Sequence, residues 1–362
     1  MRLLFTINSG IEIGVVEGCS GKSSIKIMKT VELSAFGIEH LHVVERAEPT
    51  LKEQDVLVQI EAVSLNYLDL ALIKGVYKPD LAFPAIPTSD GSGTVLQVGN
   101  AVTRWKPGDR VTVHFKQDWL SGPTTAETEA RRVGVTLPGV LAQRVVLPEH
   151  GLVRTPDSLT AEEASTLPIA GLTAWSGLLD EGNLQIGQTL LVQGTGGVSL
   201  AALQLAKASG ARVIATTSSD EKAQKLRTLG ADHVINYRQT PNWEQSVLEL
   251  TAGKGADITL DVAGTETFTK SMQAVKQNGF VGIVGFLSGT EAPMNLYIPV
   301  LKSLTLRGLS VGSRQAFEQY LQALTVMQIK PVIDRVFPIE QVQDAFRYFE
   351  SGQHFGKVVI RL

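Results

Sequence analysis

The sequence predicts an α/β fold in which a doubly wound parallel sheet is joined to a second domain rich in β-strands. Between about residues 160 and 313, short apolar runs alternate with helical segments of about 10–15 residues, the pattern of right-handed βαβ crossovers. From residue 28 to about 150, strand-like runs follow one another with turn sequences between them. The length of 362 residues fits about two domains.

The composition is that of a soluble globular protein. Apolar residues make up 43% and charged residues 19%, and the net charge is only −3, so nothing in the charge favours a nucleic acid or an anionic membrane as partner. No apolar run reaches the roughly 18 residues that span a bilayer. The single cysteine, Cys19, excludes a disulfide framework and any multi-cysteine zinc site. We therefore expect a cytoplasmic protein.

Residues 1–27 follow no helical or strand period, and we expect them to form an N-terminal extension before Met28. Polar residues interrupt their apolar stretch too early for a signal peptide. Residues 18–23 mimic a phosphate-binding P-loop, but Val16 stands where that motif needs its first glycine.

In the first domain, residues 56–63 and 93–99 are strand-like, and residues 106–109 (Lys-Pro-Gly-Asp) are typical of a turn. Residues 116–139 are long and polar, and we expect an inserted loop there rather than part of a core. His40 and His42 are expected on one face of a strand, where a bare pair is more typical of a solvated edge than of a metal site.

In the second domain, strands and helices alternate along the chain. The predicted strands are 189–193, 211–217, 258–262 and 280–286, and the predicted helices are 198–208, 220–229 and 265–276. The last part of the chain contains two amphipathic helices and a final strand, at 317–327, 340–350 and 357–362.

A glycine-rich turn, residues 194–199 (Gly-Thr-Gly-Gly-Val-Ser), follows the first of these strands and opens a helix. Gly194 allows a tight turn, and Gly196 lets the backbone approach a pyrophosphate, which would then face the free N–H groups of the helix. The third glycine of the usual motif is Ser199 here, but strand, turn, helix and second strand all come at the expected distances. The turn therefore predicts a dinucleotide site rather than a simple connection.

The end of the second strand favours NADPH over NADH. An NAD site usually has an acidic residue there for the ribose 2′-OH, whereas this chain has residues 216–219 (Thr-Thr-Ser-Ser) and no acid before Asp220. Hydroxyl groups and Lys222 would accept a 2′-phosphate. Alternatively, Ser218 and Glu221 form a helix capping box, and both interpretations can hold together.

The chain after Met28 resembles the medium-chain dehydrogenase/reductase superfamily, and within it the zinc-free branch similar to quinone oxidoreductases, whose members are often named zinc-type alcohol dehydrogenase-like proteins. The motifs that carry the resemblance keep a specific order and spacing. They lie at residues 66–69, 74–77, 88–93, 106–111, 167–174, 194–198 and 356–359.

The resemblance implies a GroES-like β-barrel catalytic domain and a Rossmann NAD(P)-binding domain, with the catalytic cleft between them. We expect an extension at 1–27, the catalytic domain at 28–165, the Rossmann domain at 166–313 and a C-terminal segment, 314–362, that returns to the catalytic domain. It also implies a homodimer formed through the outer Rossmann strand, near residues 303–311.

Zinc-dependent members of the superfamily hold a catalytic metal with cysteine, histidine and a further cysteine or acid. The matching places here are Asn66, Ser89 and about Ile169, and residues 116–139 contain none of the four cysteines of a structural zinc lobe. Since zinc prefers thiolate and imidazole ligands, we expect no metal and a metal-free reaction.

Without zinc, hydrogen-bond donors have to stabilise the developing oxyanion. The resemblance places Asn66 and Asp69 at the cleft, where Asn66 offers an amide donor and Asp69 is expected to orient, because a solvated carboxyl titrates near 4. Tyr77 stands where related enoyl reductases carry a proton-donating tyrosine. The alternatives are a cap residue for Asn66 and a half-buried packing aromatic for Tyr77.

The expected cofactor contacts come from the glycine-rich turn, the 2′-phosphate site and, by resemblance, the nicotinamide pocket. They are Thr173, Gly194, Gly196, Gly197, Val198, Ser218, Lys222, Tyr237, Gly264, Gly285 and Phe286. For Lys222 and Tyr237, a solvated helix lysine and a tyrosine at the end of a strand are the alternatives.

The sequence thus predicts a zinc-independent, NADPH-dependent oxidoreductase that transfers hydride to a small quinone or α,β-unsaturated carbonyl. NADH is possible as cofactor. A metal-free alcohol dehydrogenase or carbonyl reductase is one alternative, and an NADPH-binding structural or regulatory protein is another, because a fold does not fix function.

Overall fold

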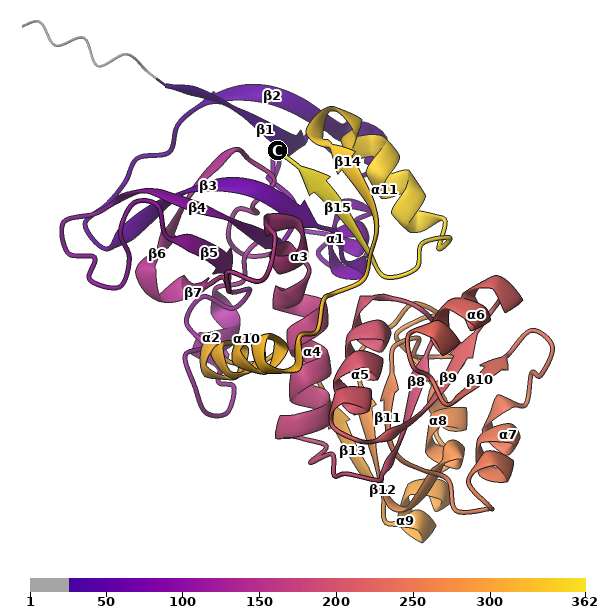
Figure 1. Ribbon diagram of the computed structural model, residues 1–362. Coiled ribbons are helices and arrows are strands. Elements are labelled where there is room, and N and C mark those ends of the chain that lie inside the picture. Colours follow the sequence, from indigo (N-terminus) through magenta and orange to yellow (C-terminus); the bar gives the residue numbers. More distant parts are fainter. Residues whose placement is uncertain (1–25) are drawn as a thin grey trace, which may run out of the picture.

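The computed structural model describes residues 26–362. The predicted extension, the P-loop-like sequence and Cys19 therefore lie outside the described residues, apart from the last two positions of the extension. The described chain forms two large sheets, one above the other in Figure 1, and a separate two-stranded sheet. Chain segments from both ends of the sequence contribute to the upper part.

The upper sheet has seven strands in the order β14-β15-β3-β4-β5-β7, with β6 also paired to β3. All pairs are antiparallel except β14 with β15. The strands are β3 (Asp55–Ser64), β4 (Asp90–Val98), β5 (Arg110–Val113), β6 (Arg144–Pro148), β7 (Leu152–Arg154), β14 (Ile333–Pro338) and β15 (Lys357–Arg361). The last two come from the C-terminus, and β15 lies directly beside β3.

Short elements surround this sheet. Strands β1 (Ile27–Leu33) and β2 (Leu41–Ala47) pair with each other, and their buried side chains belong to the same apolar core as those of β3. The remaining elements are η1 (Ile38–His40), α1 (Tyr67–Ile73), α2 (Ala126–Ala130), η2 (Glu149–Gly151), η5 (Ile339–Gln341) and α11 (Val342–Glu350).

The lower sheet has six parallel strands in the order β10-β9-β8-β11-β12-β13. They are β8 (Thr189–Gln193), β9 (Arg212–Thr217), β10 (His233–Asn236), β11 (Ala256–Asp261), β12 (Val275–Ile283) and β13 (Thr305–Gly308). The chain builds outward from β8 in one direction and from β11 in the other. This is the doubly wound order with a switch point between β8 and β11.

Helices cover both faces of the lower sheet, as the alternation of side chains on β8 requires. Leu190 and Val192 pack in the core that contains α5 and α6, whereas Leu191 packs in a separate cluster with α7. The helices are α5 (Gly197–Ala208), α6 (Asp220–Thr228), α7 (Trp243–Leu250), α8 (Phe268–Ala274) and α9 (Tyr297–Lys302).

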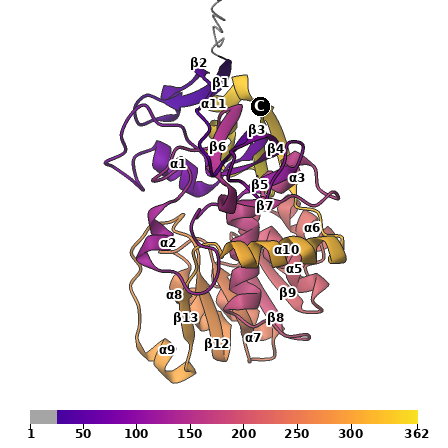
Figure 2. The ribbon, with the colours of Figure 1, turned by 90° about the vertical axis from the view of Figure 1, so that its left-hand side faces the viewer.

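A long helical run and one later helix connect the two sheets. The run comprises α3 (Ala161–Ser165), the π-helical turn η3 (Leu167–Gly171), α4 (Leu172–Trp175) and a second π-helical turn, η4 (Ser176–Asp180). Helix α10 (Arg314–Met327) lies across this run between the two sheets, in contact with α4 and β7 (Figure 2). The two large sheets are therefore joined by packed helices rather than by an open linker.

The predicted fold class, a Rossmann sheet with a GroES-like domain, is confirmed. Strand 189–193 has the predicted bounds, and the other predicted helices and strands are present with shifted ends. The strand predicted at 280–286 begins earlier, at Val275, because it pairs along β11 from there, and the helix before it is correspondingly shorter.

Two predictions about the first domain are wrong. Residues 116–139 are not simply a loop outside the core, because Lys116 is fully buried and Val133 and Val135 pack in the two main cores. His40 ends the short helix η1 and only His42 lies on β2, so the pair does not share one face of a strand.

None of the helices in residues 26–362 combines the length and apolar character that crossing a bilayer requires.

Candidate active site

The glycine-rich turn lies at the switch point of the lower sheet, between the end of β8 and the start of α5. Gly194 has a φ of 70°, and a Cβ atom built at Gly194 or Gly196 would meet nothing within 4 Å. The backbone there is therefore open to a ligand, and the free N–H groups at the start of a 12-residue helix face the same place. A nucleotide pyrophosphate fits this arrangement.

Gly197, the first residue of α5, has a different role from the two glycines before it. A Cβ atom there would lie 2.6 Å from Cδ of Lys357 and 2.9 Å from Cβ of Ala170. This glycine thus allows close packing between the helix and two other segments. Val198, next along the helix, is half-buried.

Ser218 and Tyr237 lie at the same edge of the sheet. Each directly follows a strand, and the two strands are paired so that Thr217 lies opposite Asn236. The Tyr237 backbone N–H donates to the Thr217 carbonyl at 2.9 Å, and its side chain is exposed. These residues are therefore placed at the carboxyl ends of adjacent strands, where a dinucleotide ribose is expected.

The capping box predicted for Ser218 and Glu221 is wrong by one residue. Ser219 is the N-cap of α6, and its hydroxyl accepts a hydrogen bond from the backbone N–H of Lys222 at 3.2 Å. Ser218 is therefore free of the capping role that was its alternative to cofactor binding.

The ammonium of Lys222 is hydrogen-bonded to the C-terminal segment. It donates to the carbonyl of Gly352 at 2.8 Å and to that of His354 at 3.0 Å. Burial lowers the pKa of Lys222. No hydrogen bond joins Lys222 to Tyr237 among the described residues.

The residues expected around the nicotinamide come from three segments. Thr173 is buried in α4, and Gly264 lies after β11 with a φ of 89°. Gly285 passes so close to Val262 that a Cβ atom would lie 2.1 Å from its carbonyl oxygen. Phe286 follows directly, and its half-buried ring packs against Tyr67 and Tyr77 of the GroES-like domain.

Tyr77 and Phe286 meet across the two halves. Their rings are stacked with centroids 6.3 Å apart. Tyr67 packs edge-on against the ring of Phe286, with centroids 5.7 Å apart. The hydroxyl of Tyr77 accepts a hydrogen bond from Nη1 of Arg132 at 2.8 Å. The phenol therefore has a charged donor beside its oxygen, and its own O–H remains available to donate.

Asn66 and Asp69 form a buried polar cluster at the start of α1. Asn66 is the N-cap residue, and its backbone N–H donates to Oδ2 of Asp69 at 2.8 Å. The hydroxyl of Ser89 donates to the other oxygen of this carboxyl at 3.3 Å. The cap role considered as an alternative for Asn66 is thus present, but its side chain points elsewhere.

The side chain of Asn66 is held at both ends. Its Nδ2 donates to Oδ2 of Asp90 at 2.9 Å, and its Oδ1 accepts from the ammonium of Lys357 at 2.6 Å. Asp90 also accepts from the backbone N–H of Ile169 at 3.3 Å. One N–H of the amide is therefore used inside the protein, and no hydrogen bond among the described residues uses the other.

The site predicted from the sequence does not include Asp90 and Lys357, which the structure places beside Asn66. Both belong to motifs that carry the family resemblance, yet neither was given a role. The available signal was a charged residue at the head of an otherwise apolar strand, since Lys357 precedes Val-Val-Ile. Such a position predicts a buried charge, which needs a partner.

The expectation that Asp69 is solvated is wrong. Its side chain is 2% exposed, and burial, with the negative charge of Asp90, raises the pKa of Asp69 to about 7. Burial also raises the pKa of Asp90 to about 6, against the opposing effect of Lys357. Both carboxyls therefore give up their protons at a higher pH than an exposed aspartate does.

The donor set at the cleft does not suit zinc. Asn66, Ser89 and Ile169 provide neither thiolate nor imidazole. Within residues 26–362, no group of three His, Cys, Asp or Glu side chains is arranged to hold a metal ion.

Two family descriptions match the chain. "Alcohol dehydrogenase GroES-like domain" matches residues 52–157, and "Zinc-binding dehydrogenase" matches residues 197–326.

Similar proteins cover almost the whole length. The zinc-type alcohol dehydrogenase-like protein C1773.06c of Schizosaccharomyces pombe is 39% identical over 318 residues, which are 86% of this chain and 92% of that protein. A putative alcohol dehydrogenase structure from Sinorhizobium meliloti 1021 shares 43% identity with a TM-score of 0.88, covering 93% of this chain and 99% of that one. A quinone oxidoreductase structure from Pseudomonas syringae pv. tomato DC3000 shares 29% identity with a TM-score of 0.79, covering 92% and 100%.

The matched domains, the sheet order and the open glycine-rich turn agree with one another. Proteins of this family bind a nicotinamide nucleotide. The chain belongs to the medium-chain dehydrogenase/reductase superfamily and is an oxidoreductase.

Proposed function

We propose that this protein is a zinc-independent, NADPH-dependent reductase of quinones or α,β-unsaturated carbonyl compounds. The observation that carries the proposal is the position of Tyr77, whose ring is stacked on Phe286 of the cofactor half and whose oxygen is held by Arg132. A hydroxyl donor supported by a guanidinium suits an acceptor that gains negative charge as it receives a hydride.

The proposed acceptor is planar. Tyr67, Tyr77 and Phe286 form an aromatic surface where the two halves meet, and flat conjugated molecules pack well against aromatic rings. This surface favours a quinone or an enone over a small saturated aldehyde.

When bound, the nicotinamide supplies a hydride from its C4 carbon. Asn66 would offer its remaining amide N–H to the acceptor oxygen, while Asp90 and Lys357 hold the amide in place. Tyr77 would donate a hydrogen bond, and then a proton, to the enolate or hydroquinone oxygen. Arg132 stabilises the phenol oxygen as its proton leaves.

The proposed preference for NADPH rests on the edge formed by β9 and β10. Residues 216–219 at the end of β9 carry hydroxyl groups and no carboxylate, and the first acid after them, Asp220, accepts hydrogen bonds from Asn236 and Gln239. Ser218, Lys222 and Tyr237 follow the same two strands. Binding would replace the bonds of Lys222 to the Gly352 and His354 carbonyls with a charge-assisted bond to phosphate.

The proposed zinc independence rests on the chemistry of Asn66, Ser89 and Ile169, because an amide, a hydroxyl and an isoleucine make a poor site for zinc.

A metal-free alcohol dehydrogenase or carbonyl reductase is the second candidate for the function. It is favoured by the names of the S. pombe and S. meliloti relatives.

We propose domain limits at 28–165, 166–313 and 314–362. The pairing of β15 with β3 supports the return of the C-terminal segment to the GroES-like domain.

We also propose a homodimer through the outer strand β13. The neighbouring helix α9 has no buried residue, and Tyr297, Val300 and Leu301 are each at least 70% exposed. An exposed apolar helix beside an open sheet edge fits a second copy of the chain.

The experiment that tests the function follows NADPH and NADH oxidation by chelator-treated protein against a quinone, an enone and a saturated aldehyde. We expect turnover of the quinone or the enone with NADPH, unchanged by the chelator. Turnover of the aldehyde alone, or loss of activity on chelation, would reject the proposal. Cofactor binding without any turnover would instead support the binding-protein alternative.

A further inference from the structure

Lys357 is a buried lysine whose contacts reach both halves of the molecule. Its side chain is 6% exposed, and its ammonium donates to the Leu65 carbonyl at 2.7 Å and to Oδ1 of Asn66 at 2.6 Å. Oδ2 of Asp90 lies 4.0 Å away. A charge removed from water in this way persists only when its partners compensate it, so the position of the ammonium is tightly determined.

The contacts of Lys357 fix the amide of Asn66 in one orientation. The ammonium can only donate and Asp90 accepts, so the amide oxygen must face Lys357 and the amide nitrogen must face Asp90. A rotation of the amide by half a turn would place Nδ2 against the ammonium, with two donors facing each other. The direction of the remaining amide N–H is therefore set by Lys357.

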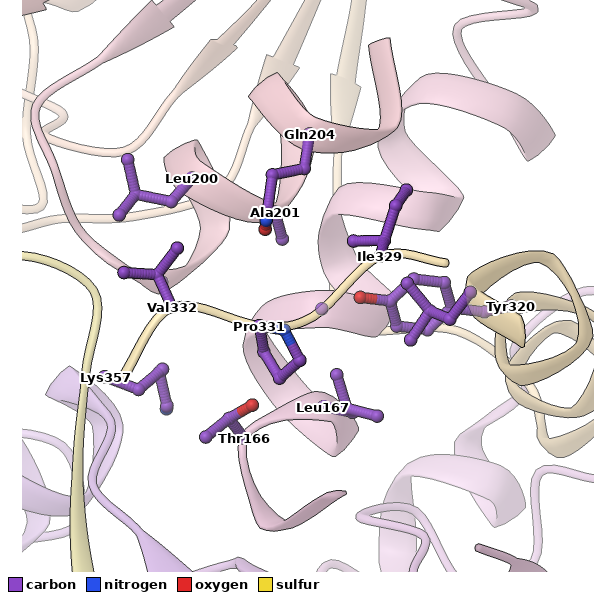
Figure 3. Close-up of a pocket in the computed structure, with 13 residues that line it drawn as sticks. Thr166, Leu167, Leu200, Ala201, Gln204, Tyr320, Ile329, Pro331, Val332 and Lys357 are labelled. Carbon is purple, nitrogen blue, oxygen red and sulfur yellow. The ribbon is translucent and has the colours of Figure 1, made fainter. Parts of the chain in front are cut away.

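The same strand is tied to the nucleotide turn. The backbone N–H of Gly356 donates to the Thr195 carbonyl at 2.9 Å, and the stem of Lys357 packs against Gly197, where any Cβ atom would collide with it. Beside Lys357 lies a cavity of about 20 Å³ between α5 and residues 329–332, with Tyr320 at its other end (Figure 3). This space holds about one water molecule, so protein atoms are the main partners of the lysine.

We propose that Lys357 is a positioning residue that aligns the amide of Asn66 with the cofactor held at the glycine-rich turn. The proposal rests on the role given to Asn66 in the proposed function, but it requires no particular acceptor. Lys357 acts through Asn66 and touches the turn only with its stem and neighbouring backbone. Its loss should therefore slow hydride transfer while leaving cofactor affinity unchanged.

A purely structural role is the competing explanation, and Lys302 provides the matched control. Its ammonium is also partly buried and donates to three carbonyls, those of Met272, Gln273 and Val275. It lies at the end of α9 and has no contact with Asn66 or the glycine-rich turn. Lys302→Met thus removes a buried lysine without touching the site.

The kinetic test is a double-mutant cycle of Lys357→Met and Asn66→Ala. It measures the single-turnover rate of hydride transfer to any acceptor that the unchanged protein reduces, and the NADPH dissociation constant from fluorescence. We expect Lys357→Met to lower the rate about 10- to 100-fold with a dissociation constant within about twofold, and Lys302→Met to leave both unchanged. In the Asn66→Ala background, Lys357→Met should cause no further loss.

A second variant guards against misfolding. Lys357→Met leaves Asp90 without its cation, so Lys357→Met/Asp90→Asn removes both charges and should restore the melting temperature toward that of the unchanged protein. The slow hydride transfer should remain, because Oδ1 of Asn66 still lacks its donor. Recovery of the rate together with stability would overturn the proposal.

A readout independent of turnover is the side-chain amide of Asn66, observed by NMR of protein labelled with ¹⁵N-asparagine and assigned with Asn66→Ala. We expect its two N–H signals to shift and exchange faster in Lys357→Met but not in Lys302→Met. Unchanged signals, or an equal rate loss in both backgrounds of the cycle, would overturn the proposal. If the unchanged protein reduces neither a quinone nor an enone, the proposed function fails, while these signals still decide the role of Lys357.

Discussion

At the scale of single residues, burial decides the chemistry of the site. Asp69 stands one helical turn after Asn66 in a segment whose spacing predicts a shared face, and the structure brings the two together. The spacing could not show that Asp90 and Lys357 complete the cluster. That contact depends on β15 pairing with β3 across almost 300 residues of sequence, which no local pattern encodes.

The raised pKa of Asp69 predicts a pH-dependent stability. The folded protein binds this proton more tightly than the unfolded chain, so the stability that the proton contributes is lost as the pH rises from about 4 through about 7. Asp69→Asn imitates the protonated form. Its free energy of unfolding in urea, relative to the unchanged protein, should therefore improve by about 2–3 kcal/mol from pH 5 to pH 8.

The control for this comparison is Asp344→Asn, since Asp344 is exposed on α11. Its difference from the unchanged protein should be the same at both pH values. A pH-independent difference for Asp69→Asn as well would show that Asp69 ionises like a solvated carboxyl.

Tyr77 carries the second prediction at this scale. Tyr77→Phe keeps the ring stacked on Phe286 and removes only the hydroxyl that Arg132 holds. We expect NADPH affinity to be unchanged and kcat with an enone to fall about 100-fold. Steady-state kinetics with fluorescence titration of the cofactor measure both, and a kcat within about threefold of the original would remove Tyr77 from the proton-donating role.

At the scale of elements, the nucleotide turn was predictable and the segment 116–139 was not. Strand, turn and helix follow one another within about 20 residues, so the information is local. By contrast, the polar composition of 116–139 concealed its buried members. Lys116 is covered because Glu129 of α2 pairs with its ammonium and Trp119 lies under it at 4.7 Å, a compensation that only the folded segment provides.

The turn predicts a variant that separates binding from folding. Gly196 has a φ of −79°, which alanine can adopt, and nothing lies near its missing Cβ atom. Gly196→Ala should leave the melting temperature of the cofactor-free protein within about 2 °C. The added methyl group would lie where a pyrophosphate approaches, so calorimetric titration should show NADPH bound at least about tenfold more weakly. Equal affinity would place the nucleotide elsewhere.

Helix α6 offers a matched pair of lysines. Lys222→Ala removes the proposed phosphate partner, whereas Lys225→Ala removes an exposed lysine that is paired with Glu221, one turn earlier on the helix. We expect the dissociation constant of NADPH to rise about tenfold in Lys222→Ala only, with that of NADH unchanged. If both cofactors lost affinity equally, Lys222 would be acting through the C-terminal segment that it contacts, not through the 2′-phosphate.

At the scale of the whole molecule, the parallel sheet followed from alternating strands and helices, whereas the placement of the C-terminus needed the family resemblance. The pattern of residues 333–361 indicates two strands and a helix but not the sheet they join. Their pairing with β3 closes the catalytic half and puts Lys357 beside Asn66. The site is thus assembled from chain segments near both ends of the described sequence.

The exposed face of α9 predicts the oligomeric state. Val300→Glu and Leu301→Glu each place a charge on the apolar surface beside β13 and should convert a dimer to monomers in light scattering coupled to size exclusion. Val326→Glu is the control, since Val326 is 83% exposed on α10, away from that edge. A dimer that survives both α9 substitutions would show that the subunits meet through another surface.

The central claim, metal-free hydride transfer to a conjugated carbonyl, is tested most directly by tracing the hydride. Chelator-treated protein would reduce an enone with NADPH deuterated at C4, in separate runs with each label stereochemistry. We expect one of the two labels to appear at the β-carbon of a saturated ketone, as mass spectrometry and NMR of the product would show. Deuterium on the carbonyl carbon of an allylic alcohol, or no product after chelation, would contradict the account and favour a carbonyl reductase or a metal-dependent enzyme.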